Sequence, residues 1–436
     1  MARHFSVHRF SNGLTVVIEF MPQTVSTAVG FLVGTGARHE PGRLDGVSHF
    51  LEHMMFKGTS RRTWQDINRE FDEMGARYNA FTGWEETCYY AWTLNAETPR
   101  ALDLLSDMLA PALPENEFNT EKKVILEEIA RYRDMPDHVA FEEAMKIAFA
   151  GHRLSSNILG STKTIGRLTR DEMQQYFAQR YVPATTTLFA CGNVDEAALL
   201  AGVDKLWGAR SGPGANGPGR PDLAPAFRHG RTTVRRREVA REHLVLMWPT
   251  LALSSRRSVA AMLLGSILGD DQNSRLYWAL KHTGLAEDAG GGYWGFSDAG
   301  LVAVSASCDP EKAGKVVAIL RAEPAKLKKG IRKEELQRVK NRARTSLVFA
   351  AETPFSRFRQ ILHHWTMRRE LLTAEEMLAR IDAVTLDDLH ELLHQYPLDT
   401  EGAMVGLGPL KQVRSAALRR RRKQPAPRTR KAARRR

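Results

Sequence analysis

Three ionisable side chains that could share one chemical task lie within five positions, at His49, Glu52 and His53. In a helix, at about 100° per residue, the two imidazoles would lie about 40° apart on one face, with the carboxylate beside them. Two histidines one turn apart can both reach an ion about 2 Å from each ring nitrogen, which is what zinc requires. Glu52 would then be placed to accept a proton from water at the metal rather than to bind the metal. The spacing indicates a metal site with a base beside it.

The alternative is a set of ordinary polar residues on an exposed helix, because five-residue patterns are common. The rest of the segment argues against it. A helix from about Asp45 to Lys57 would be apolar around most of its circumference, at Val47, Phe50, Leu51, Met54, Met55 and Phe56. Ionisable groups on such a buried helix need compensation, and a metal ion with its water supplies it. We therefore favour the metal site.

Zinc also requires a third protein ligand, and the segment from Glu121 to Ile129 offers candidates. On a helical wheel Glu128 falls inside the apolar sector, and Glu121 shares that sector two turns earlier. Glu127 falls on the other side and is predicted to be a solvated surface charge. Glu128 is therefore the ligand candidate, and Glu121 a carboxylate that supports the ligands. The alternative for both is a pair of half-exposed helix acids.

Alternating strand patterns and longer helical patterns surround these residues. Within the first half we expect strands near 14–21, 25–35, 77–82, 87–94 and 185–191, and helices near 64–74, 98–110, 115–133, 138–149 and 170–180. Runs of strands and runs of helices indicate an α+β fold, in which helices pack on one face of a mainly antiparallel sheet.

A Gly- and Pro-rich stretch divides the chain into two halves that resemble each other at an offset of about 215 residues. Gly75–Asn79 is echoed by Gly290–Trp294, and a capping box at Thr169 recurs at Thr385. We therefore predict two homologous domains: 1–208 with the metal, a linker at 209–229, 230–412 without metal ligands, and an Arg-rich disordered tail at 413–436.

The bulk composition narrows the compartment and the partners. The net charge is +13, but residues 419–436 carry eleven positive charges and no acid, so the rest of the chain is close to neutral. Such a tail could contact nucleic acid or an anionic surface weakly, although a solvated tail without a partner is the favoured interpretation. The sequence has no apolar run long enough to span a membrane and no recognisable secretory signal, and its three cysteines are widely scattered. We expect a cytoplasmic protein without a disulfide framework.

The segment Gly46–Thr59, with His-x-x-Glu-His at its centre, closely resembles the zinc motif of the pitrilysin and mitochondrial processing peptidase family, whose members are inverted zincins. The resemblance extends through Tyr78–Thr82, Glu121–Ile129 and Leu188–Asp195 and covers essentially residues 5–410. It implies one zinc ion per chain, a peptidase activity, and the bacterial type of two homologous domains that pairs with a second chain.

The same resemblance implies a role for each site residue. His49, His53 and Glu128 would bind zinc, Glu52 would act as the general base, and Glu121 would support the ligands from behind. Asn79 and Ala80 would lie on a strand edge that holds the substrate peptide extended, a mode in which main-chain hydrogen bonds supply affinity. From the residues alone, Tyr78–Thr82 is an ordinary sheet strand.

One departure from the family pattern concerns the second half. Many relatives carry an Arg and a Tyr there that reach the scissile carbonyl, whereas this sequence offers Lys281 and Glu287. The segment that corresponds to the metal motif reads Leu264–Leu268 and has no ligand. We therefore expect a zinc endopeptidase of extended peptides that pairs with a homologous, metal-free subunit carrying the Arg and Tyr, and we favour this over a homodimer. The alternative is a non-catalytic scaffold or peptide-holding subunit of the same fold.

Overall fold

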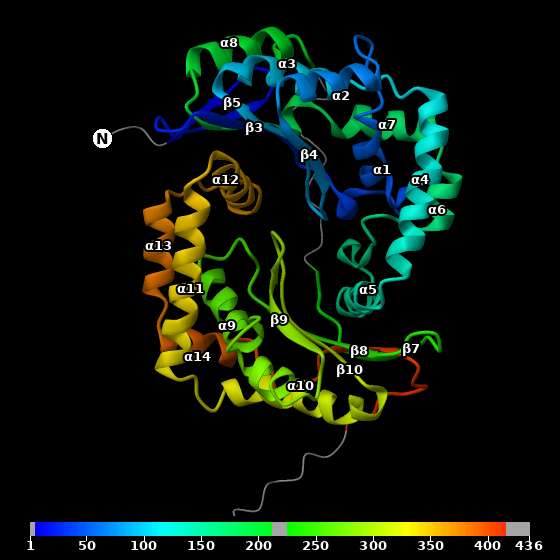
Figure 1. The fold of residues 1–436 in the computed structure, drawn as a ribbon, viewed down its shortest axis with the longest axis vertical. Coiled ribbons are helices and arrows are strands. Elements are labelled where there is room, and N and C mark those ends of the chain that lie inside the picture. The colour runs from blue at the N-terminus through cyan, green and yellow to red at the C-terminus, as the bar shows by residue number, and fades with distance from the viewer. Residues whose placement is uncertain (1–4, 212–224, 416–436) are drawn as a thin grey trace, which may run out of the picture.

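The computed structural model describes residues 5–211 and 225–415. These residues form two α+β halves that face each other, each with a sheet and its own helices on the outer side (Figure 1). The predicted fold class is confirmed. Most of the predicted linker and tail, at 212–224 and 416–436, lies outside the described residues, and the exact domain boundaries stay predictions. No helix in the described part of the chain is long and apolar enough to cross a membrane.

The N-terminal half contains a six-stranded sheet in the order β1-β2-β6-β3-β5-β4. Its strands are β1 (Phe5–Arg9), β2 (Thr15–Phe20), β3 (Ser26–Val33), β4 (Arg77–Thr82), β5 (Thr87–Leu94) and β6 (Thr186–Gly192). Its helices are α1 (Val47–Met54), α2 (Trp64–Glu73), α3 (Thr98–Met108), α4 (Glu115–Arg133), α5 (Pro136–Ala148), α6 (Thr162–Arg167), α7 (Arg170–Arg180) and α8 (Glu196–Trp207). β2 and β6 are parallel and the other pairs antiparallel, so the sheet is mainly antiparallel as predicted.

The C-terminal half repeats this order with one strand fewer, as β7-β11-β8-β10-β9. Its strands are β7 (Gly230–Arg235), β8 (Glu242–Thr250), β9 (Asp288–Gly295), β10 (Gly300–Cys308) and β11 (Ala403–Gly408). Its helices are α9 (Ser258–Gly269), α10 (Ala313–Leu327), α11 (Lys333–Ala351), α12 (Pro354–Arg368), α13 (Ala374–Ala383) and α14 (Leu386–Gln395), with a π-helical turn at Tyr277–Lys281. The predicted repeat is visible in the caps, since Thr169 caps α7 and Thr385 caps α14 in the same way.

Each half contributes one helix that packs on the sheet of the other half. α5 buries Ala140, Ala144 and Ala148 against β8 and β11 of the C-terminal sheet, while α12 buries Phe358 and Ile361 against β3 and β6 of the N-terminal sheet. Each sheet is therefore covered by its own helices on one face and by the other half's helix on the second face. The sequence prediction of helices on one face missed this exchange.

A buried ion pair joins the exchanged helix α12 to the N-terminal sheet. Arg357 on α12 is 2% exposed, and its guanidinium lies 2.7 Å from the carboxylate of Glu19 on β2. A buried charge that loses its partner costs several kcal/mol, roughly 3–5, so this pair opposes separation of the two halves.

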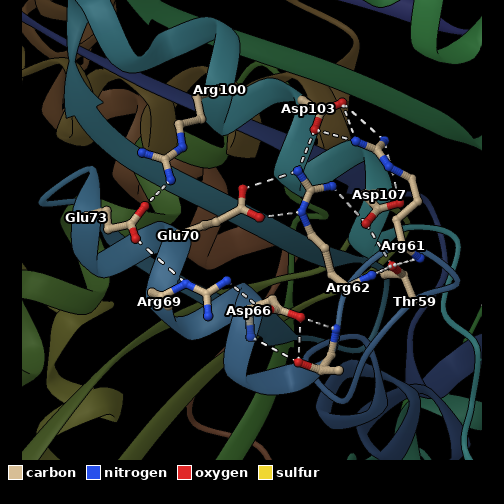
Figure 2. A network of polar contacts seen from close by, with 11 residues as sticks. Thr59, Arg61, Arg62, Asp66, Arg69, Glu70, Glu73, Arg100, Asp103 and Asp107 are labelled. Carbon is tan, nitrogen blue, oxygen red and sulfur yellow. Dashed lines mark hydrogen bonds and ion pairs between the residues drawn. The ribbon is translucent and has the colours of Figure 1, made fainter.

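A second polar network holds the loop that follows the metal motif (Figure 2). Arg62 donates to Glu70 on α2 and to Asp103 and Asp107 on α3, at distances of 2.7–3.2 Å. Thr59 donates to the same Asp107 at 2.7 Å. Because the Arg62 side chain is only 11% exposed, this network ties the end of the motif segment rigidly to the two helices behind it.

Candidate metal centre

The N-terminal end of the motif helix α1 is fixed by residues outside the motif. Gly46 precedes it at φ 94°, and a Cβ there would lie 2.5 Å from the Leu159 carbonyl oxygen, so only glycine fits. The Glu40 carboxylate accepts hydrogen bonds of 2.7 Å from the amides of Gly46 and Ser48 and so caps the helix. Tyr176 on α7 holds the Ser48 hydroxyl at 2.8 Å. The helix covers 47–54 and is shorter than the predicted 45–57, because Glu40 caps it at Gly46 and turns replace the helix after Met54.

The burial of α1 agrees with the sequence pattern, since Val47, Phe50, Leu51, Met54 and Met55 have no exposed surface. Phe50 stacks on Phe118 of α4 with the ring centroids 4.8 Å apart. This contact sets the two helices side by side, so that Glu121 and Glu128 of α4 face the imidazoles of α1.

His49, His53 and Glu128 converge on one point. One Glu128 carboxylate oxygen lies 3.8 Å from His49 Nε2 and 3.7 Å from His53 Nε2. Ligands about 2.0–2.2 Å from one tetrahedral ion lie about 3.4 Å from each other, so these separations are within a few tenths of an ångström of a zinc site. The donor set of two imidazoles and a carboxylate also suits zinc. The three residues therefore fit the ion that their sequence spacing suggested.

Burial keeps the first imidazole in the form that binds metals. His49 is 9% exposed, and burial, followed by the neighbouring His53, lowers the pKa of His49 to about 3. The ring is therefore neutral near pH 7, with a nitrogen lone pair available for a ligand bond.

Glu121 lies behind His53 and orients its ring. One Glu121 oxygen is 3.1 Å from His53 Nδ1, and the other is 2.5 Å from the Lys57 ammonium. Burial alone would raise the pKa of Glu121, but the hydrogen bonds with His53 and Lys57 outweigh it and leave this pKa below its ordinary value. The carboxylate therefore stays charged, fixes the Nδ1–H tautomer and leaves Nε2 free for a metal.

Glu52 lies in the same cavity but accepts from a different partner. The Thr82 hydroxyl on β4 donates to it at 2.5 Å, and burial raises the pKa of Glu52 despite that bond. His49, Glu52, Thr82 and Glu128 line one cavity of 320 Å³, which residues of α5 close from the far side. The arrangement places a half-buried carboxylate beside the candidate ligands and not among them.

β4 lies at the open edge of the N-terminal sheet, next to the cavity. Asn79 is exposed, and its side-chain oxygen accepts from the Ala80 amide at 2.9 Å. An edge strand offers main-chain groups to another extended chain. Asn79 and Ala80 thus lie on an edge as expected, three and two residues before Thr82.

Comparison with known proteins assigns the chain to a family. The model of Insulinase (Peptidase family M16) matches residues 15–162, and that of the Peptidase M16 inactive domain matches residues 167–343. The chain belongs to peptidase family M16. Bacillus subtilis has a relative called an uncharacterized zinc protease, YmxG, that is 31% identical over 88% of this chain and 93% of its own. Another relative so called, from Streptomyces coelicolor, is 32% identical over 93% of this chain and 90% of its own.

Solved M16-like structures share the fold. A protease from Helicobacter pylori superposes with a TM-score of 0.85 at 21% identity, covering 92% of this chain and 99% of its own. A structure from Pseudomonas fluorescens described as a peptidase M16 inactive domain superposes with a TM-score of 0.86 at 17% identity. The match covers 95% of this chain and 100% of that structure's chain. The predicted pitrilysin-type family is confirmed, and membership of M16 together with the zinc protease relatives supports a peptidase.

The second half of this M16 chain keeps Lys281 and Glu287 away from the metal cavity. Lys281 pairs with Asp288 at 2.9 Å and Glu287 with Arg241 at 3.1 Å, and neither lines the cavity. α9, which takes the place of α1, has no ligand residue at the corresponding Leu264–Leu268.

Sequence reasoning missed two residues that the structure places against the site, Lys57 and Thr82. Lys57 follows His53 by four residues, a helical spacing that could have linked both to one carboxylate. Thr82 shares a strand face with Ala80, but nothing in the sequence joins it to Glu52, thirty residues earlier. Glu127 is exposed, as the helical wheel predicted.

Proposed function

We propose that this chain is a zinc-dependent endopeptidase that hydrolyses peptides or unfolded segments bound in extended form, and that it is the metal-bearing half of a dimer. The observation that carries the proposal is the convergence of His49, His53 and Glu128 beside Glu52 in one cavity. Zinc held by these three residues would supply Lewis-acid activation of water and polarisation of the peptide carbonyl.

The roles of the chain's own residues follow from their positions. Glu52 accepts the proton of the attacking water and passes it to the leaving amine, and its raised pKa brings it closer to the working pH of a general base. Thr82 orients the Glu52 carboxylate. Glu121 keeps the His53 ring in the ligand tautomer.

The free edge of β4 would hold the substrate. A peptide added beside Asn79 and Ala80 forms main-chain hydrogen bonds that do not depend on its side chains. This favours extended, unfolded segments over folded surfaces and leaves the sequence preference to the cavity walls.

The need for a partner subunit is inferred from the hydrogen-bond donors that the second half of this chain does not supply. Lys281 and Glu287 are engaged with Asp288 and Arg241, and Glu287 cannot donate a hydrogen bond as a phenol does. Stabilisation of the developing oxyanion would then need donors from a homologous, metal-free subunit with an Arg and a Tyr. A homodimer would bring only a second Lys281 and Glu287.

A pair of variants tests the activity itself. Glu52→Gln should keep zinc, measured by plasma mass spectrometry, and lose about 10²–10⁴-fold in cleavage of a fluorogenic peptide. Glu127→Gln, on the exposed side of α4, should change neither. A chain that never binds stoichiometric zinc, or a Glu52→Gln variant with full activity, would instead favour the non-catalytic, peptide-holding subunit.

A separate assay tests the partner. The chain alone should cleave unstructured peptides slowly, and adding a homologous subunit with the Arg and Tyr should raise the rate. Full zinc-dependent activity of the chain alone, unchanged by Lys281→Ala, would refute the partner requirement.

A further inference from the structure

The C-terminal half contains a cavity of 650 Å³ that has no part in the proposed chemistry. Its walls are α9, α11, α12, α13 and the end of β9. By the order of elements, α9, β9, α11 and α12 correspond to α1, β4, α4 and α5, which enclose the metal cavity. The second cavity is therefore the counterpart of the metal cavity in the repeated half.

Part of the lining of this cavity is apolar and exposed to solvent. Met262 is 40% exposed and Trp294 37% exposed, and both line it together with Val259, Leu347 and Ile381. Exposed apolar side chains gathered in a concave site are the usual mark of a ligand surface.

The lining also carries cationic groups. Arg342, Arg368 and Arg380 line the cavity, against a single lining acid, Asp270. Arg380 forms an ion pair with Glu370 at 2.9 Å. Arg368 Nη1 is buried 4.0 Å from the same carboxylate and has no hydrogen-bond partner in the described part of the chain.

Arg342 retains the most capacity for a ligand. Its side chain is 48% exposed, and its Nε lies 3.4 Å from Asp270. Within residues 5–211 and 225–415 its terminal nitrogens donate no hydrogen bond. A guanidinium with two free terminal nitrogens is suited to bidentate binding of a carboxylate.

His363 and His364 also line the cavity but do not add charge. Burial lowers the pKa of both, that of His364 to about 4, so the rings are neutral near pH 7. The positive potential therefore comes from the arginines, and it disfavours a peptide's amino terminus.

The second cavity adjoins the metal cavity. The ring of Trp294 packs against Phe141 of α5 with the centroids 5.5 Å apart, and Phe141 lines the metal cavity. β9, which carries Trp294, is the edge strand of its sheet, as β4 is in the first half. The aromatic pair therefore joins the walls of the two cavities.

We propose that the C-terminal cavity binds the carboxyl-terminal residue of a peptide, with the terminal carboxylate on Arg342 and an apolar side chain against Met262 and Trp294. The inference rests on the proposed peptidase function and narrows its substrates to peptides with a free, apolar carboxyl end. Amidated peptides and peptides with a cationic end bind less well.

Binding, not turnover, tests this site. The full chain carrying Glu52→Gln is titrated by calorimetry with an N-acetylated hexapeptide ending in leucine, as the free acid and as the amide. We expect the free acid to bind at least ~10-fold more tightly, which is about 1.4 kcal/mol. Arg342→Gln should abolish the difference. Arg344→Gln should retain it, because Arg344 lies on the same helix with the same 48% exposure but pairs with Asp382 outside the cavity.

Equal affinity for acid and amide, or a preference that survives Arg342→Gln, would overturn the proposal. Dodecanoate is the third probe. If dodecanoate binds more tightly than the free-acid peptide, and if this binding depends on Arg342, the proposed peptide ligand is wrong and a fatty acid takes its place. Since no bond is cleaved, a wild-type chain without peptidase activity would refute the proposed function but leave this preference in place.

Discussion

The two halves build the same layers but use the contact between central helix and edge strand differently. In the N-terminal half, the Glu52 and Thr82 side chains meet between α1 and β4, beside the candidate metal ligands. In the C-terminal half, α9 packs directly on β9 through glycines: a Cβ on Gly269 would lie 2.2 Å from the Gly291 amide nitrogen. The first half keeps room for polar side chains at this contact, whereas the second half closes it with backbone packing.

The halves also differ in how they hold the segment after the central helix. Arg62 engages three carboxylates on α2 and α3. Among the described residues, Arg275 engages one carboxylate, that of Glu335 on α11, and the Gly330 carbonyl. We call these arginine contacts the clamps of the two halves: Arg62 with its three acids in the first, and Arg275 with Glu335 in the second. The half with the candidate metal site has the more extensive clamp, which suits a site whose ligands must be placed within fractions of an ångström.

Disrupting the glycine contact between α9 and β9 should have the largest effect on stability. Gly269→Ala adds a methyl group with no space against β9, so we expect a loss of several kcal/mol in the free energy of unfolding, at or above the usual ~1–3 for overpacking. In α6, a Cβ added at Gly166 would meet no described atom within 4 Å outside its own helix turn and chain neighbours. Gly166→Ala should therefore be neutral or stabilising by up to about 1 kcal/mol. Thermal unfolding measures both, and a Gly269→Ala chain as stable as Gly166→Ala would disprove the packed contact.

The clamp of the first half can be tested with adjacent arginines. Arg62→Gln leaves three acids without their shared partner, and we expect about 3–5 kcal/mol lower stability in urea unfolding. Arg61→Gln should cost less than about 1 kcal/mol, because that side chain is 52% exposed. Similar losses for the two variants would contradict the distinction between a buried clamp and a surface pair.

The contact of Glu121 with the candidate ligand His53 should affect the affinity for zinc. Glu121→Gln removes the carboxylate that orients His53, so zinc affinity should fall about 10–100-fold in a competition with a chelator. Glu127→Gln on the same helix is the control. Unchanged affinity in Glu121→Gln would reduce Glu121 to a structural contact.

The smallest effect is expected from the clamp of the second half, the Arg275–Glu335 pair, whose contribution to stability should depend on pH. Burial would raise the pKa of Glu335, but the Arg275 guanidinium outweighs it and lowers this pKa to about 2. A depressed carboxyl pKa contributes stability above its unfolded value of about 4.5 that is lost as pH falls toward 2. The stability difference between wild type and Glu335→Gln should therefore be full at pH 7 and shrink below pH 4.5. A difference that stays constant down to pH 3 would contradict the pairing.

Most of the fold could be predicted because local patterns decided it. The predicted strands and helices of the first half match β2 to β6, α2 to α5 and α7 to within about three residues, and the wheel separated exposed Glu127 from Glu121 and Glu128. β1, α6 and α8 are not among the predicted elements.

What the sequence could not predict depends on distant pairs. Thr82 meets Glu52, and Arg357 pairs with Glu19, across segments whose approach follows only from the tertiary fold. The exchange of α5 and α12 is of the same kind, because an apolar helix face does not specify which sheet it covers.

The central claim is that the first half alone holds the metal, and anomalous diffraction at the zinc edge from zinc-loaded crystals tests it most directly. A single peak bounded by His49, His53 and Glu128 is the predicted result. No peak there, or an equivalent peak between α9 and β9, would contradict the assignment of the two halves.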